Sequence, residues 1–435
     1  LGSGSSAQSA NTPITLTSLS GFSYSSDFLL KFSQYDNWYY NSDGIAIDDV
    51  SITVGCPTVT WSGSSSNEWS DPLNWSCGYV PTPNDIVIIP SSASYTNAPN
   101  VNISDAVCAD LTIESGGALS CVDPIGKLTV STIALNNGGI LQINAGEVES
   151  SGRMDWDGQV IMSGIGILDV NGSEIEQSST TSESITGGTI YCAGDWDAEF
   201  ATGFTPTGGT IIFDASSEKS ILSHTGLSSQ PTSYFNNIIL NGNIWQYYAV
   251  QVKGDITING TYYWDMYGAN LYLDGDLVTN GSGTNSYISD GGNFFSDYLS
   301  DATLYLGGSD NQLIGSFNDY SINVAVEKTG GTVSANGYIG IGRLFVGYGS
   351  GSANSGKLEI DNETFLCTDN AYLNEGTLKV TGGLLHINNS PGFMNINPNG
   401  ELSIEDGEVR VGDASFDNNS YIYMNAGALN ISGGI

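Results

Sequence analysis

A short glycine motif recurs along this chain and constrains its fold more than any other feature. Its form is G-x-L-x-[IV]-x-x-G, and clear examples are GILQINAGEV, GTLKVTGGLL and GELSIEDGEV, which begin at positions 139, 376 and 400. GALNISGGI at 427 starts in the same way, and GILDVNGSEI at 166 and GKLEIDNETF at 356 are variants. Neighbouring units thus step from 139 to 166, from 356 to 376, from 376 to 400 and from 400 to 427. A repeat of roughly 20 to 27 residues with only strand and turn signals is typical of a β-solenoid.

The motif also indicates how such a fold would be stabilised. Alternate side chains of a strand point to opposite faces, so the L-x-[IV] pair points inward and the residue between points outward. Coils stacked about 4.8 Å apart bury a continuous core that one coil could not form alone. We therefore predict an all-β chain whose main part is a right-handed parallel β-helix, or β-solenoid, of about twelve coils and about 60 Å. An array of separate β-sandwich domains is the alternative, and it would not require regularly spaced glycines.

A segment rich in tryptophan and proline precedes the first predicted coil strand. The stretch NEWSDPLNWSCGYVPTPNDIVIIP, residues 67–90, contains Trp69 and Trp75, and Trp61 lies shortly before it. The first coil of a solenoid would expose a sheet edge and an apolar core, which is an aggregation hazard unless it is covered. We predict that the three tryptophans form the N-terminal cap of the solenoid and that the prolines of this segment restrict its path.

The net charge of the chain makes some classes of binding partner improbable. The sequence has 46 acidic residues against 10 basic ones, a net charge of −36. This charge repels the phosphates of nucleic acids and anionic membrane surfaces, and it favours cations. The sequence has no apolar run of about 18 residues, so a membrane span is not predicted. It begins at Leu1 without the pattern of a signal peptide, and we expect it to be an internal segment of a larger protein.

Six cysteines are scattered through the chain, at positions 56, 77, 108, 121, 192 and 367. They show no C-x-x-C spacing, and the only two histidines are far apart, so a zinc site is not indicated. An even number of scattered cysteines fits disulfides formed outside the cytoplasm, and buried free thiols are the alternative. We predict a bridge between Cys77 and Cys108, which would join the cap to the first coils. Cys121 is an alternative partner for Cys108.

The cap segment carries a resemblance to a known family. The pattern TWSG…NEWSDPLNWSCGYVPTPNDIVIIP…CADLTIESGGALS resembles the start of the β-helical repeat regions in large secreted and cell-surface proteins of Bacteroidetes, with Asp110 where that family has asparagine. GGTIIFDASSEKSIL and YFNNIIL resemble its later coils. The resemblance covers roughly residues 59–435 and is specific over 60–120. It implies export by the type IX secretion system, an extracellular or outer-membrane-associated location, and a role as an adhesin or in gliding motility.

A second resemblance lies near the beginning of the chain. DFLLKFSQYDNWYYNSDGIAIDDVSI is similar to the last strands of a jelly-roll module of the MAM or cleaved-adhesin type, which often ends in D-G-x-x-I-D-D-V-x-I. The resemblance implies calcium binding by Asp43, Asp48 and Asp49, because oxygen ligands suit this hard cation; a solvated acidic turn is the alternative. The predicted division of the chain is a partial jelly-roll β-sandwich, a cap with the first coil, and β-helix repeats, over residues 1–55, 56–100 and 101–435.

The sequence offers little support for catalysis. A lyase of the pectin-degrading type needs a basic residue as general base, and the few basic residues form no cluster with acidic ones. A hydrolase needs two carboxylates across a groove. MDWDG and GDWDA supply acidic pairs, but in an extended strand both carboxylates lie on the side opposite the tryptophan. We therefore predict a non-catalytic role, and a polysaccharide-degrading β-helix is the alternative.

Two non-catalytic roles then need to be distinguished, a rigid stalk in a surface fibre and a carbohydrate-binding adhesin. Residues 234–272 have the highest density of aromatic residues in the chain. Because strand side chains alternate, a run such as TYYW cannot point wholly inward. Trp245, Tyr263, Trp264 and Tyr267 are therefore candidate glycan contacts. The alternatives are an external aromatic ladder that stacks coil on coil, and a docking surface for another protein or domain.

Overall fold

The computed structural model divides the chain into two units, residues 1–55 and 56–435. All the described residues belong to the second unit: 56, 58–198, 201, 203–222, 229–281, 288–289, 302–347, 356–388, 393–416 and 421–431. The predicted jelly-roll module over residues 1–55 lies outside them. So do Asp43, Asp48 and Asp49, the candidate calcium ligands.

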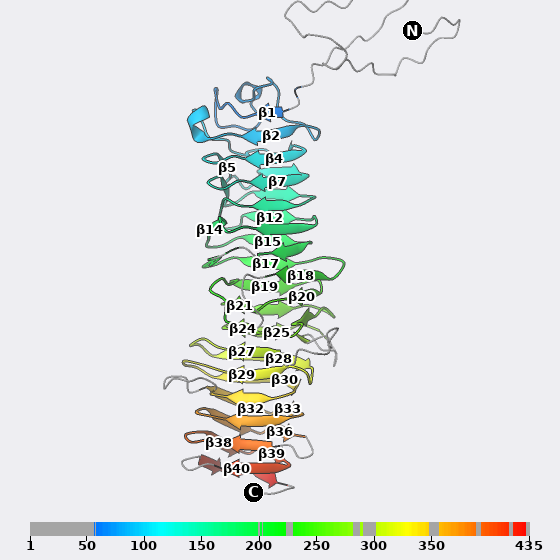
Figure 1. Cartoon of the computed structure of the whole chain (residues 1–435), viewed down its shortest axis with the longest axis vertical. Coiled ribbons are helices and arrows are strands. Elements are labelled where there is room, and N and C mark those ends of the chain that lie inside the picture. The colour runs from blue at the N-terminus through cyan, green and yellow to red at the C-terminus, as the bar shows by residue number, and fades with distance from the viewer. Residues whose placement is uncertain are drawn as a thin grey trace, which may run out of the picture. The chain divides into compact units, whose positions relative to one another are not determined.

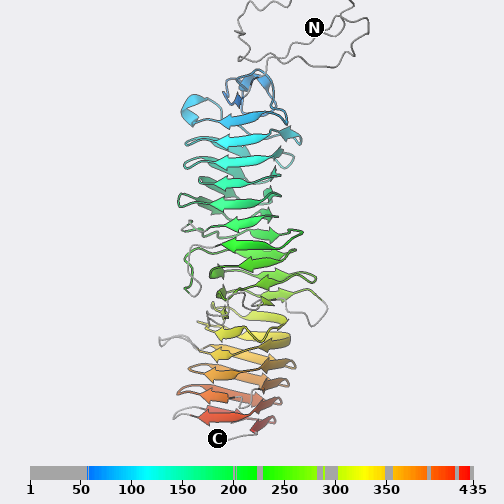
Figure 2. The same cartoon turned by 45° about the vertical axis from the view of Figure 1, so that its right-hand side comes forward.

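The second unit is a parallel β-solenoid of about 14 turns (Figures 1 and 2). The only helices in the described ranges are two short 3-10 helices, η2 (Pro72–Asn74) and η3 (Ser92–Ser94). No helix in this part of the chain is long and apolar enough to cross a membrane. The predicted all-β solenoid is confirmed, with about two turns more than the repeat pattern suggested.

Each complete coil contributes strands to three faces of the solenoid, and the strands of each face pair in parallel with those of the coils above and below. The first face contains β1 (Thr58–Thr60), β2 (Ile86–Ile89), β4 (Asp110–Ile113), β7 (Thr132–Leu135), β10 (Met154–Trp156), β13 (Glu174–Gln177), β16 (Asp195–Asp197), β18 (Lys219–Leu222), β20 (Ile244–Gln246), β23 (Trp264–Asp265) and β26 (Ile288–Ser289).

The second face consists of two separate sheets. The four-stranded sheet contains β5 (Ala118–Cys121), β8 (Ile140–Ile143), β11 (Gln159–Met162) and β14 (Ser182–Ile185). The eight-stranded sheet contains β21 (Val250–Val252), β24 (Leu271–Leu273), β27 (Thr303–Leu306), β29 (Asn323–Val326), β31 (Leu344–Val346), β34 (Asn370–Leu373), β37 (Phe393–Ile396) and β40 (Asp413–Phe416). The gap between β14 and β21 produces the slot described below.

The third face has the longest run of paired strands. It contains β3 (Ala106–Val107), β6 (Lys127–Val130), β9 (Glu147–Ser150), β12 (Ile167–Val170), β15 (Thr189–Cys192), β17 (Thr210–Phe213), β19 (Asn237–Leu240), β22 (Ile256–Ile258), β25 (Leu277–Thr279), β28 (Gln312–Asn318), β30 (Val333–Ile341), β32 (Lys357–Asp361), β35 (Thr377–Thr381), β38 (Glu401–Glu405) and β41 (Tyr421–Met424). β30 is long enough to turn a corner, because its start pairs with β32 and its end pairs with β33 (Thr364–Cys367). The first face then continues as β33, β36 (Leu384–Ile387), β39 (Glu408–Val411) and β42 (Ala428–Ile431).

The glycine motif places its apolar pair in the core, as predicted. In β35, Leu378 and Val380 are fully buried, and Leu378 lies in register with Leu358 of one neighbouring coil and Leu402 of the other. The motif steps from 356 to 376 and from 376 to 400 are therefore true coil steps.

The motif steps from 139 to 166 and from 400 to 427 are not coil steps. β8 and β12 lie on different faces, and β42 pairs with β39 on the first face, whereas the next partner of β38 is β41. The motif marks a strand that follows a glycine corner on any of the three faces. Each of these two motif steps therefore connects strands on different faces of the solenoid.

Polar residues at the corners also repeat from coil to coil. The Asn259 side-chain amide donates a hydrogen bond to Asn241 Oδ1 at 2.7 Å, and the Asn280 amide donates to Asn259 Oδ1 at 3.0 Å. Each amide in the middle of such a ladder both donates and accepts, so the ladder meets the hydrogen-bonding needs of stacked corners. Corners of this kind keep successive coils in register without contributing to the apolar core.

The predicted cap residues lie together at the N-terminal end of the solenoid. The side chains of Trp61, Trp69 and Trp75 are buried in the core cluster, and Trp75 meets both other rings edge-on at centroid distances of 4.8 and 4.7 Å. Asn74 anchors this segment because its side-chain oxygen accepts from the backbone N–H groups of Ser65 and Ser66 at 3.0 and 2.9 Å. β1 precedes Trp69 and Trp75 in the sequence and β2 follows them, yet both strands belong to the stacked first face. The cap segment is therefore inserted between the first two strands of this face.

The predicted bridge between Cys77 and Cys108 is wrong. Cys77 pairs with Cys56, and their Cα atoms are 6.1 Å apart, which is a normal separation for a disulfide. Cys108 and Cys121 are buried free thiols. Cys108 is directed into the core, whereas Cys77 is only partly buried and lies beside the segment that leads into β1. The bridge therefore ties the cap to the start of the solenoid unit.

Peptide mapping without reduction should recover Cys56 linked to Cys77. The bridge joins cysteines with a sequence separation of 21, so its reduction should lower the free energy of unfolding by about 3 kcal/mol. Reductant should lower the stability of a Cys108→Ala variant in the same way, and it should leave that of a Cys77→Ala variant unchanged. Recovery of a peptide pair linking Cys77 to Cys108 would contradict this assignment.

Candidate functional site

The aromatic segment predicted from the sequence is divided between the core and the surface. Trp264 is fully buried, and its Nε1 donates to Gln246 Oε1 at 2.7 Å. The Gln246 amide in turn donates to the backbone oxygen of Asn270 at 2.6 Å. Trp264 therefore belongs to a buried and satisfied network, and its side chain is not accessible to a ligand outside the solenoid.

Several aromatic residues of this segment remain at least partly exposed, Tyr248 and Tyr262 among them. Four of these residues around the first face form what we call the aromatic patch: Trp245, Tyr247, Tyr263 and Tyr267. The rings of Trp245 and Tyr267 are nearly parallel, with an interplanar angle of 16° and a centroid distance of 6.1 Å. Tyr247 meets Tyr267 edge-on at 5.3 Å. Three of the four predicted glycan contacts, Trp245, Tyr263 and Tyr267, are thus partly exposed at the surface. Tyr247, which was not predicted, contacts the rings of both Trp245 and Tyr267.

The position of Tyr267 depends on an unusual backbone conformation. Its φ is +46°, in the left-handed region that residues other than glycine rarely adopt. The Tyr267 backbone N–H donates to Asp265 Oδ1 at 3.0 Å, which supports this turn. Strained backbone of this kind is found preferentially at functional sites. The turn orients the Tyr267 ring against Trp245.

Carboxylates surround the aromatic patch. The Tyr263 hydroxyl donates to Glu218 Oε1 at 2.5 Å, and this hydrogen bond is the main cause that raises the pKa of Tyr263 to about 12. Burial raises the pKa of Tyr247, and the nearby negative charge of Asp195 adds to this effect. The patch therefore offers hydroxyl groups and carboxylates next to stacked rings.

The acidic pair in GDWDA lies as the alternation predicts. Asp195 and Asp197 of β16 point outward, and Trp196 between them is fully buried. Asp195 Oδ1 accepts from both the backbone N–H and the hydroxyl of Ser220, at 2.7 and 2.9 Å. The two carboxylates lie on one face of one strand, so this pair does not flank a groove from opposite sides.

A separate aromatic ladder follows the second face. Tyr272 stacks on Tyr305 at 4.6 Å, and Phe345 stacks on Tyr372 at 5.2 Å; the residues of each pair are register partners in adjacent strands. Tyr272 ends the aromatic segment found in the sequence, but its stacking partner Tyr305 lies outside that segment, and Ala325 separates this pair from the pair of Phe345 and Tyr372. Sequence reasoning missed Tyr305, Phe345 and Tyr372 because single aromatic residues at coil spacing do not form a local cluster.

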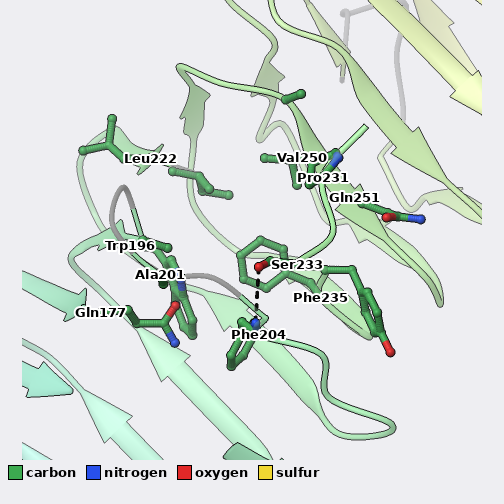
Figure 3. A pocket seen from close by; sticks show the side chains of 14 residues that line it. Gln177, Trp196, Ala201, Phe204, Leu222, Pro231, Ser233, Phe235, Val250 and Gln251 are labelled. Carbon is green, nitrogen blue, oxygen red and sulfur yellow. Dashed lines mark hydrogen bonds between the residues drawn. The ribbon is translucent and has the colours of Figure 1, made fainter. Parts of the chain in front are cut away.

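A slot opens where the strands of the second face are interrupted. Between β14 and β21, the described residues contribute no strand to this face. The slot contains a small cavity of about 30 Å³ that opens to solvent (Figure 3). Its base is formed by the buried residues Gln177, Trp196, Phe204 and Phe235, and its mouth by the half-buried residues Ala198, Leu222, Ser233 and Tyr234.

Aromatic rings line the base of the slot. Trp196 lies 5.7 Å from Phe204 and 5.4 Å from Phe235 between ring centroids. The Ser233 hydroxyl holds the wall in place by accepting from the backbone N–H of Phe204 at 3.2 Å. The walls are therefore mostly apolar and fixed by packing.

Two buried glutamines, Gln177 and Gln251, are exceptions to this apolar lining. The Gln251 amide lies within hydrogen-bonding distance of the Lys253 ammonium and the Pro231 carbonyl. Gln177 is the last residue of β13 and points inward, in register with Trp156 of the preceding coil, and only 1% of its surface is exposed. Neither its amide nitrogen nor its oxygen has a hydrogen-bond partner among the described residues, and the same holds for Nε1 of the buried Trp196. Figure 3 shows Gln177 beside the rings of Trp196 and Phe204. The sequence contains one signal for it, a glutamine at an inward position of an alternating strand.

Lys328 is a second polar residue inside the solenoid that the sequence did not reveal. Its side chain is fully buried, and the ammonium group donates to the backbone oxygen of Gly307 and to Gln312 Oε1. Burial lowers its pKa, whereas the negative charge of nearby Asp274 acts in the opposite direction. Lys328 therefore has protein partners and does not mark an open site.

Comparison with known proteins gives one partial match. Residues 60–149, which hold the cap and the first coils, are similar to a domain of unknown function, DUF8693. No curated protein and no solved structure matches the chain. No group of three or more metal-binding side chains occurs in the described ranges. The fold and the site thus define a capped parallel β-solenoid with a surface aromatic patch and an interrupted second face.

Two buried glutamines provide a matched test of the site geometry. Gln246→Leu would leave the buried Trp264 Nε1 without its acceptor, so it should lower the free energy of unfolding by about 1–3 kcal/mol. Gln177→Leu removes an amide that has no partner in the described part of the chain, so it should leave the melting temperature unchanged or raise it. Calorimetry of the two variants checks both outcomes. An equal loss in both variants would show that the Gln177 amide is satisfied.

Proposed function

We propose that this chain is a non-catalytic structural and adhesive segment of a large secreted or cell-surface protein, in which the solenoid acts as a rigid stalk. The observation that carries this proposal is the stacked core, in which inward residues such as Leu358, Leu378 and Leu402 continue in register from coil to coil over about 14 turns. Each coil contacts only its neighbours, so length is the property that this fold supplies directly.

The ion pairs support a structural use of the basic residues. Lys127 contacts Glu147 of the next coil at 2.8 Å, and Lys253 contacts Asp274 at 2.7 Å. Lys379 lies between carboxylates of both neighbouring coils, at 3.3 Å from Glu359 and 3.1 Å from Glu405. These lysines connect stacked coils, so they are engaged in contacts that a stalk requires.

The disulfide and the net charge support an extracellular location. Disulfides form and persist mainly in oxidising compartments, and the Cys56–Cys77 bridge fixes the cap segment. A net charge of −36 favours solubility and repels anionic surfaces. The resemblance of the cap and coils to Bacteroidetes surface proteins points in the same direction and motivates the adhesive part of the proposal.

Pulsed electron spin distance measurements on the full chain test the stalk. The register relates Lys127 to Leu313 through eight coil steps and Ile167 to Leu313 through six. Spin labels on cysteines at these positions should therefore give narrow distributions near about 38 Å and about 29 Å. Broad distributions, or two equal mean distances, would contradict a rigid stack of coils.

A second candidate function is carbohydrate binding at the aromatic patch. It is favoured by the parallel rings of Trp245 and Tyr267 beside hydroxyl groups and carboxylates, because such surfaces suit the apolar face and the hydroxyls of a sugar ring. The ladder pair Tyr272 and Tyr305 differs in ring separation, since its rings stack directly on one another at 4.6 Å, compared with 6.1 Å between Trp245 and Tyr267. The patch and the ladder therefore offer matched sites for comparison.

Replacement of Trp245 by alanine tests this second function. The variant should lose binding on a glycan array or to cell surfaces while its melting temperature changes little. Tyr272→Ala should lower the melting temperature, because it removes a stacked pair, and should leave glycan binding unchanged. A large loss of thermal stability in Trp245→Ala with unchanged binding would assign the patch to coil stacking instead.

A further inference from the structure

The base of the slot contains polar atoms that the described residues do not satisfy. Both polar atoms of the Gln177 side chain and Nε1 of Trp196 are buried without partners there. Such groups are rare in native proteins, and each one requires an explanation such as a ligand or an ordered water. Trp156, the register partner of Gln177, does find a partner, because its Nε1 donates to the Gly158 carbonyl at 3.1 Å. The indole N–H of Trp196 thus differs from that of Trp156 in having no acceptor among the described residues.

The chemistry of these groups defines a complementary ligand. The Gln177 NH₂ and the Trp196 N–H are donors and require an acceptor, whereas Gln177 Oε1 is an acceptor and requires a donor. The neighbouring rings of Trp196, Phe204 and Phe235 require an apolar group. An acetamido group, CH₃–CO–NH–R, combines a methyl group, a carbonyl acceptor and an N–H donor.

A charged group fits the base of the slot poorly. None of the described residues that form the base, Gln177, Trp196, Phe204 and Phe235, carries a charge, whereas the Lys253 ammonium lies at the mouth, 5.7 Å from the centroid of the Tyr234 ring. Burial of an unpaired charge is far more costly than burial of a neutral amide. The group bound at the base is therefore neutral.

We propose that the slot binds the acetamido group of an N-acetylated sugar. The methyl group packs against the rings of Trp196 and Phe204, the carbonyl oxygen accepts from the Gln177 amide or the Trp196 N–H, and the ligand N–H donates to Gln177 Oε1. The sugar ring stays at the mouth, where the half-exposed ring of Tyr234 and the Ser233 hydroxyl offer aromatic and polar contacts. This site is separate from the aromatic patch and does not depend on carbohydrate binding there.

Titration of the full chain with N-acetylglucosamine, with glucose as the matched sugar that lacks the acetamido group, tests the proposal. Calorimetry should detect binding of N-acetylglucosamine and no binding of glucose. In saturation-transfer spectra, the acetyl methyl group should receive the strongest transfer. Gln177→Leu should weaken binding by about tenfold or more, the effect of losing hydrogen bonds to one buried amide.

Two further variants separate loss of the site from loss of the fold. Ala201→Leu should block the slot sterically while Gln177 and Trp196 remain, because Ala201 lines the slot and is almost fully buried. Leu313→Ala, at an exposed position of β28 outside both the slot and the aromatic patch, should bind N-acetylglucosamine as the parent chain does. The melting temperature of each variant shows whether it is folded.

Several results would overturn the proposal. They are equal binding of glucose, unchanged affinity in a folded Gln177→Leu variant, and binding of an acetyl-lysine peptide without binding of N-acetylglucosamine. A fourth is a high-resolution structure, determined in the presence of the sugar, in which only water occupies the slot. Loss of binding in Trp245→Ala but not in Gln177→Leu would move carbohydrate binding to the patch and refute the slot site.

Discussion

The parallel hydrogen-bond ladder between successive coils is the constraint on which the rest of this structure depends. Each strand pairs with the strand one coil before and one coil after it, so every coil must present its inward residues at the same positions. Leucine and valine at alternate positions meet this demand in β35, and the buried glutamines Gln177 of β13 and Gln246 of β20 are exceptions. These exceptions are informative because the ladder leaves them no freedom to turn outward.

Features that follow from alternation and spacing could be predicted from the sequence. The solenoid, the outward acidic pair around Trp196 and the buried cap tryptophans all rest on such local patterns. Which of Trp245 and Trp264 faces outward could not be predicted, because a shift of one residue in the start of a strand exchanges its two faces. In the structure, Ile244 and Gln246 point inward and leave Trp245 outside, whereas Trp264 itself points inward.

Features that depend on the relative placement of coils were beyond sequence reasoning. The partner of Cys77 is decided by the path of the chain into β1, and no spacing rule distinguishes Cys56 from Cys108. The slot lies where the described residues form no strand of the second face between β14 and β21, although Phe235 still pairs in parallel with Val252 of β21. The surroundings of Gln177 depend on side chains from several coils. A polar residue at an inward position was the only local sign of this site.

The corners of the solenoid differ in the number of residues they contain, and this has a consequence for the evolution of such proteins. One coil step on the third face runs from Leu358 to Leu378, whereas another runs from Leu277 to Ile314 and takes a much longer stretch of chain, yet both keep the parallel register. Insertions at corners therefore leave the inner layers untouched, and duplication of a whole coil adds a complete layer. New binding loops can arise at any level of the rod by small genetic steps, without a redesign of the scaffold that carries them.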